Sequence, residues 1–100
     1  MTARLLLAAV LAAAPCAVLS QESAAARDLA ASCAQCHGTQ GRSVSSEVLP
    51  LAGLPKERIV SQMKAFKEGT RPATVMHQLA KGYTDQQIDQ IAGYFAAQKR

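Results

Sequence analysis

The sequence contains no tryptophan and only four aromatic residues, so aromatic side chains can supply little of a hydrophobic core. Charge is also sparse, since 18% of the 100 residues are charged and the formal net charge is +4. This balance excludes an acidic disordered tail and disfavours nucleic-acid binding, and the length excludes a multidomain enzyme. Because a domain this small buries a smaller share of its surface, it often depends on disulfides, a metal ion or a cofactor.

One uninterrupted apolar run is present, from Leu5 to Ala14, and it is shorter than the ~20 residues that a membrane-spanning helix needs. Arg4 precedes the run and Pro15 ends it, and Val18-Leu19-Ser20 supplies residues that a signal peptidase reads. We therefore predict a signal peptide over residues 1–20, which is removed, and a mature domain over residues 21–100. The mature protein is expected to have no stable membrane insertion.

Two other readings of the N-terminus fit less well. A lipoprotein signal would place lipid on Cys16, but Pro15 stands where a small residue is required. A buried N-terminal helix would need a polar face, which the run lacks. Of the 49 apolar residues, 16 lie within the first 20 positions, so the mature domain is poorer in core material than the whole chain suggests.

The mature sequence predicts an all-α domain of three to five short helices, because no segment alternates with the period of a strand. An Ala-rich segment from Ser23 to Ala34 predicts the first helix, and Lys56–Lys67 predicts another that ends at Gly69. Thr84 and Gln87 have the spacing of a capping box at the start of the last helix. The positions expected to be buried on that last helix are Ile88, Ile91, Ala92 and Phe95.

Cys33-Ala34-Gln35-Cys36-His37 is the motif that carries chemistry. In C-x-x-C-H the two thiols attach to the vinyl groups of haem and the His ligates the iron, since residues three and four apart share a helical face. A zinc half-site would need a second Cys/His pair, but only His77 remains. A thioredoxin-type dithiol would need βαβ units, and a disulfide across two residues would be strained and would leave His37 without a role. The motif therefore predicts one covalent haem c.

Three side chains in the C-terminal half could provide the sixth iron ligand. Met63 lies in the apolar stripe of a predicted helix, which favours core packing. Met76 follows a Pro-containing segment between two helices, which can cross a haem face in extended form, and is the preferred ligand. His77 is its neighbour and remains an alternative. A Met/His pair raises the reduction potential because the soft thioether favours ferrous iron.

The mature chain resembles the class I cytochromes c of bacterial periplasms, and among them the single-haem cytochrome subunits of flavocytochrome c sulfide dehydrogenases. The matching segments are Cys33–Gly38, Leu51–Pro55, Gln62–Gly69, Arg71–Met76 and Ala80–Asp85. The resemblance implies a class I cytochrome c fold around one haem, with thioethers at Cys33 and Cys36 and axial iron ligands His37 and Met76. It also implies that the first helix packs on the last, with Tyr94 or Phe95 at the crossing.

One departure from the family pattern concerns the carbonyl that holds the axial His. Relatives tend to read Pro-x-Leu-Ala-Gly, and the carbonyl of this loop proline commonly accepts the Nδ1 proton of the His. In this chain Pro50 directly precedes Leu51, so either the Leu49 or the Pro50 carbonyl is expected to have this role.

The haem is expected to be buried and closed to substrate. Filled axial positions would make the protein a carrier of single electrons rather than an enzyme, and apolar burial adds to the effect of Met on the potential. Tyr83 and Arg71 are candidate partners for a haem propionate. The apolar residues expected to pack against the haem are Leu29, Leu51, Leu54, Ile59, Val60 and Leu79.

Three functions follow from this interpretation. The first is a periplasmic electron-transport protein, either a haem subunit that accepts electrons from a flavin-containing sulfide dehydrogenase subunit or a freely diffusing carrier of a respiratory or photosynthetic chain. The second is a haem peroxidase or gas sensor with a labile sixth ligand. The third is a thiol oxidoreductase or zinc module.

Overall fold

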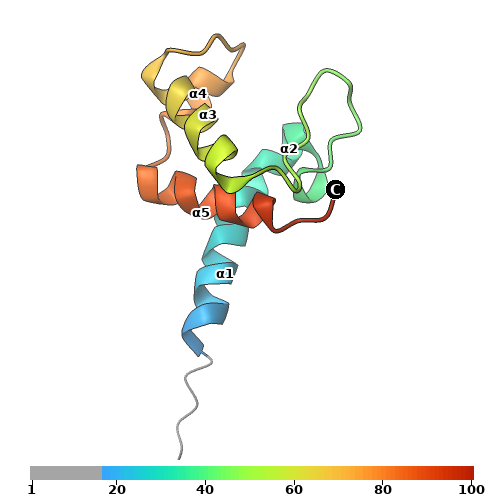
Figure 1. Cartoon of the computed structure of the whole chain (residues 1–100), viewed down its shortest axis with the longest axis vertical. Helices are drawn as coiled ribbons and strands as arrows, with labels where there is room; N and C mark the ends of the chain where they lie inside the picture. The colour runs from blue at the N-terminus through green and yellow to red at the C-terminus, as the bar shows by residue number, and fades with distance from the viewer. Residues whose placement is uncertain (1–16) are drawn as a thin grey trace, which may run out of the picture.

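The computed structural model describes residues 17–100, and within that range every regular element is helical (Figure 1). This confirms the predicted all-α class. The elements are α1 (Ala17–Ala30), α2 (Ala34–His37), α3 (Lys56–Glu68), α4 (Met76–Ala80) and α5 (Asp85–Ala96), with 3₁₀ turns η1 (Ala31–Cys33) and η2 (Thr39–Gly41).

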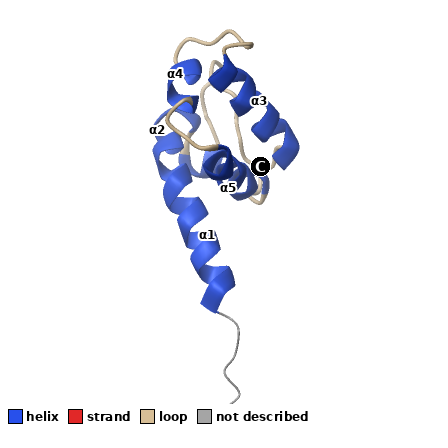
Figure 2. Cartoon of the chain, turned by 90° about the vertical axis from the view of Figure 1, so that its left-hand side faces the viewer, coloured by secondary structure: helices blue, strands red, loops and turns tan. Residues whose placement is uncertain are grey.

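The predicted signal peptide lies mostly outside the described residues, which begin at position 17, and the cleavage site remains a prediction. Helix α1 continues through Gln21, where cleavage is expected. Its N-terminal part projects away from the other helices in both views (Figures 1 and 2).

The sequence predicts one continuous helix over Ser23–Ala34, but the structure interrupts it after Ala30. Helix α1 ends at Ala30, the 3₁₀ turn η1 follows, and α2 starts at Ala34. The backbone stays in the right-handed helical region at Ala30 and at Cys33, so the chain tightens without reversing. The Cys-x-x-Cys-His motif is therefore divided between the end of η1, which holds Cys33, and α2, which holds Cys36 and His37.

Helices α3 and α5 form where the sequence predicts them. Gly69 ends α3 in the left-handed conformation, with φ of 78°. Thr84 and Gln87 form the complete capping box at the start of α5. The Gln87 amide donates to Thr84 Oγ1 at 3.1 Å and the Thr84 amide donates to Gln87 Oε1 at 2.9 Å.

Helix α4 corrects the expectation that the chain around Met76 is extended. The segment up to and including Val75 lacks a helix, and Met76 is the first residue of α4. The spacing of Met76, Leu79 and Ala80 is helical and could have predicted this short element.

The core lies where α5 meets α1 and α3, and α5 crosses α1 at a steep angle (Figure 1). Phe95 and Ile88 are the largest fully buried side chains, and Tyr94 packs against the core from a partly buried position. This confirms the predicted packing of the first helix on the last, and all four predicted positions of α5 are buried. The core residues are Ala30, Leu54, Ile59, Met63, Ala80, Ile88, Ile91, Ala92 and Phe95.

Of the residues expected to pack against haem, Leu54 and Ile59 belong to this core, whereas Leu29, Leu51 and Val60 are partly buried against it. Leu79 differs, since half of its surface is exposed. Among the described residues, no helix has the length and apolarity needed to cross a membrane.

Candidate functional site

The two thiols and the imidazole of the Cys-x-x-Cys-His motif are presented on η1 and α2. Cys33 is half-buried against the core, Cys36 is exposed, and His37 is the last residue of α2. The two cysteines form no disulfide with each other. Burial raises the pKa of the Cys33 thiol, although a hydrogen bond with Ser32 acts in the opposite direction.

His37 is oriented by a backbone carbonyl of the loop that follows. Its Nδ1 atom lies 2.7 Å from the Leu49 carbonyl oxygen. A carbonyl can only accept a hydrogen bond, so Nδ1 carries the proton and Nε2 keeps its lone pair. The imidazole is thus held in the tautomer that an iron ligand requires.

This contact decides between the two carbonyls that the sequence left open. Leu49 accepts the bond, and it stands two residues before Leu51-Ala52-Gly53, as the proline of Pro-x-Leu-Ala-Gly does in relatives. The position of the carbonyl relative to Leu-Ala-Gly is therefore retained, although the proline itself is shifted by one residue.

Gly41 fixes the loop that carries this carbonyl. Its own carbonyl accepts the amides of Leu51 at 2.8 Å and Ala52 at 3.1 Å. Gly41 has a φ of +77°, and a Cβ at this position would lie 2.8 Å from Phe95 Cδ1. The core helix α5 thus presses directly on the turn that aligns Leu49 with His37, and only glycine fits there.

Met76 lies at the start of α4, partly buried, and its side chain packs against the core. The neighbouring apolar side chains are poorly covered, since Val75 and Leu79 are 52% and 51% exposed. Met63 is 9% exposed and is a core residue, as the stripe on its helix predicts. The Nδ1 atom of His77 is buried and has no hydrogen-bond partner among the described residues.

The two proposed propionate partners have other contacts. The Tyr83 hydroxyl is 2.9 Å from Ser32 Oγ, which links the turn before α5 to the residue before Cys33. The Arg71 guanidinium lies 4.9 Å from the centre of the Phe66 ring, a cation–π geometry. Lys67 Nζ donates to the Tyr83 carbonyl at 2.7 Å and so ties α3 to the same turn.

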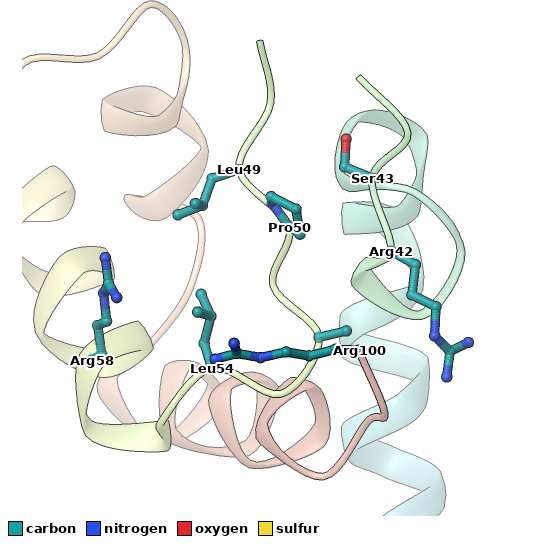
Figure 3. Close-up of a pocket in the computed structure, with 8 residues that line it drawn as sticks. Arg42, Ser43, Leu49, Pro50, Leu54, Arg58 and Arg100 are labelled. Atoms are coloured by element: carbon teal, nitrogen blue, oxygen red, sulfur yellow. The ribbon is translucent and has the colours of Figure 1, made fainter. Parts of the chain in front are cut away.

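A hollow of about 470 Å³ opens beside the loop that holds His37 (Figure 3). Leu49, Pro50 and Leu54 form apolar walls, and Arg58 and Arg100 reach toward it from opposite sides, whereas the guanidinium of Arg42 points away. The lining residues are Arg42, Ser43, Leu49, Pro50, Ala52, Leu54, Arg58 and Arg100.

This arrangement of residues fits neither a zinc site nor a reactive dithiol well. Among the side chains described, residues 24–100, no three His, Cys, Asp or Glu residues are grouped as a metal ion would require. A reactive dithiol needs a thiolate, but burial raises the pKa of Cys33 and keeps its thiol protonated at neutral pH.

Haem c fits the residues present. Two thiols and a His with a free Nε2 lie on the consecutive elements η1 and α2. Leu49, Val75 and Leu79 expose apolar surface around the candidate ligands that a porphyrin would cover. A helical domain with this motif and an oriented imidazole is a c-type haem protein. Residues 23–99 match the sequence profile of the cytochrome c family, and the chain belongs to that family. Membership of this family implies one covalently bound haem c.

Relatives of known function agree with this assignment. The chain is 48% identical to the cytochrome subunit of sulfide dehydrogenase from Chlorobaculum tepidum over 67% of its length, and covers 60% of that relative. It is 37% identical to cytochrome c4 of Pseudomonas aeruginosa over 78% of its length, and covers 39% of it. It is 32% identical to cytochrome c-554(548) of Halomonas halodenitrificans over 78% of its length and covers 98% of that protein. The chain thus spans less than two thirds of the first two relatives.

Proposed function

We propose that this chain is the periplasmic haem subunit of a sulfide-oxidising flavocytochrome, which accepts single electrons from a flavoprotein subunit. The observation that supports haem chemistry most directly is the 2.7 Å contact of His37 Nδ1 with the Leu49 carbonyl, beside Cys33 and Cys36. The sulfide dehydrogenase role is supported by the 48% identity to the Chlorobaculum tepidum subunit.

In this proposal Cys33 and Cys36 would hold the haem through thioether bonds, and His37 Nε2 and the Met76 thioether would ligate its iron. The haem supplies the exchange of single electrons. The Leu49 carbonyl keeps the proton on Nδ1 of His37, which maintains the ligand tautomer and increases the basicity of the imidazole.

The surrounding side chains set the reduction potential. The thioether of Met76 favours ferrous iron, and the apolar surface of Leu49, Val75 and Leu79 keeps water from the site, which disfavours the ferric charge. With His37 and Met76 both ligating the iron, a substrate would have no place to bind there. The catalytic oxidation of sulfide then belongs to the flavin-containing partner, and this chain conducts the electrons away.

A freely diffusing carrier is the alternative. It is favoured by the match to cytochrome c-554(548), whose length this chain covers almost completely, at 98%. A haem peroxidase or gas sensor is a weaker candidate, because it requires Met76 to leave the iron readily. Export to the periplasm depends on the signal peptide predicted over residues 1–20.

Purification from the native periplasm separates these functions. The subunit proposal predicts co-elution of haem with a flavin-containing protein, and reduction of the haem on addition of sulfide. A red monomer that sulfide does not reduce would favour the diffusing carrier. Rapid binding of carbon monoxide to the ferrous protein at neutral pH would instead favour the sensor or peroxidase and would contradict ligation by Met76.

A further inference from the structure

We infer that the hollow between Arg58 and Arg100 is the site of the haem propionates, an assignment that rests on the proposed haem chemistry. The two arginines come from distant parts of the chain: Arg58 belongs to α3, and Arg100 follows α5. Figure 3 shows their side chains reaching toward the hollow from opposite sides of Leu54. Tyr83 and Arg71, which the sequence offered for this role, do not line it.

The positive charge of the arginines that line the hollow favours the binding of an anion. No acidic side chain lines it, and Arg42, Arg58 and Arg100 form no ion pair with the side chains described over residues 24–100. Guanidinium groups stay charged at all accessible pH values, so close cations repel each other unless an anion lies between them. A carboxylate is a suitable anion because its two oxygens match the paired N–H groups of arginine.

The apolar walls identify the anion as part of a larger hydrophobic group. Leu49 and Leu54 line the same hollow as the arginines, so the site suits a carboxylate attached to an apolar body. Leu49 also links the hollow to the iron, because its carbonyl accepts the bond from His37. The vinyl groups and the propionates of a haem lie at different edges of the ring, so their partners must be separate. In this chain the thiols lie on η1 and α2, whereas the arginines lie on α3 and after α5.

Hydrogen bonds fix the backbone on which Arg100 is carried. Arg42 Nε donates to the Lys99 carbonyl at 2.8 Å, and the Gly53 amide donates to the Phe95 carbonyl at 2.9 Å. The stem of Arg100 then crosses Gly53 so closely that a Cβ there would lie 2.8 Å from Arg100 Cγ. Arg42 is thus a positioning residue, which acts on the hollow through the backbone that carries Arg100.

The test compares Arg58→Gln, Arg100→Gln and Arg71→Gln in the haem-loaded full chain. Each removes one positive charge, but only the first two remove it from the hollow. We measure covalent haem content, the propionate bending mode by resonance Raman, and the equilibrium with a reference redox couple. Arg58→Gln and Arg100→Gln are expected to shift the propionate mode and to move the equilibrium about tenfold toward ferric iron, since a positive charge near the haem favours the ferrous state.

Arg71→Gln is expected to leave the propionate mode unchanged, as Arg71 stacks on Phe66. An unchanged mode in both hollow variants, or a shift caused by Arg71→Gln, would overturn the assignment. So would binding of inorganic phosphate to the wild-type holoprotein that is lost in Arg58→Gln, because the hollow would then be open to free anions. A wild type without covalent haem would instead refute the proposed function itself.

Discussion

Gly41→Ala is expected to destabilise the domain strongly and to disturb the axial His. Two costs combine at this position. A non-glycine residue at φ of +77° costs about 1–2 kcal/mol, and the new Cβ would lie 2.8 Å from Phe95 Cδ1 and 2.9 Å from the Ala52 amide nitrogen. Overpacking of a core side chain adds about 1–3 kcal/mol. The sum of about 2–5 kcal/mol is a large part of the stability of a small domain.

Gly69→Ala is the matched control. Gly69 has nearly the same φ, +78°, but nothing lies within 4 Å of a Cβ built on it, so only the backbone cost applies. Guanidinium chloride unfolding of the haem-loaded proteins measures both free energies, provided that the m-values agree. The difference between the two variants, about 1–3 kcal/mol, isolates the steric conflict with Phe95 and Ala52.

The same experiment tests the link between Gly41 and His37. Displacement of Leu51 and Ala52 in Gly41→Ala should move the Leu49 carbonyl, weaken its bond with Nδ1 and change the reduction potential. Gly69→Ala should leave the potential unchanged. Equal losses of stability in the two variants, with equal potentials, would refute the reasoning.

Three further predictions concern the ligand, the helix cap and the thiols. Met76→Ala should abolish the sulfur–iron charge-transfer band and lower the reduction potential, whereas Met63→Ala should cost about 2–5 kcal/mol in unfolding free energy and retain the band. Thr84→Ala should cost about 1 kcal/mol, measured by denaturant unfolding, because the Gln87 amide loses its acceptor. In the chain produced without haem, Cys36 should alkylate faster than Cys33 at pH 8, since Cys36 is exposed and burial raises the pKa of Cys33.

Each of these predictions can be checked by a control or by a result that would contradict it. An unchanged spectrum in Met76→Ala would exclude Met76 as a ligand and direct attention to His77. Thr84→Ser retains the hydroxyl and should restore the stability lost in Thr84→Ala. For the thiols, a rate of alkylation that is faster at Cys33 than at Cys36 would contradict the burial of Cys33.

Local sequence signals were sufficient to predict α3 and α5, because each has a recognisable residue pattern at one of its ends. The capping box of Thr84 and Gln87 and the left-handed Gly69 act through neighbouring backbone groups, so their consequences appear within one turn. Helix α4 was missed because the proline before it suggested extended chain, and its five residues carry only one turn of apolar spacing. The break after Ala30 has no comparable signal, since Ala31 and Ser32 are compatible with a continuous helix.

The sequence by itself determined the haem chemistry of this protein, because both thiols and the His belong to one pentapeptide whose geometry is local. Only the tertiary structure decided which carbonyl orients His37 and which cations face the hollow. Leu49 reaches His37 because the Gly41 turn is packed on Phe95, and Arg100 lines the same hollow as Arg58 because the chain after α5 passes Gly53. These contacts join residues 12 or more positions apart, and no local pattern specifies them, since they depend on how the helices pack.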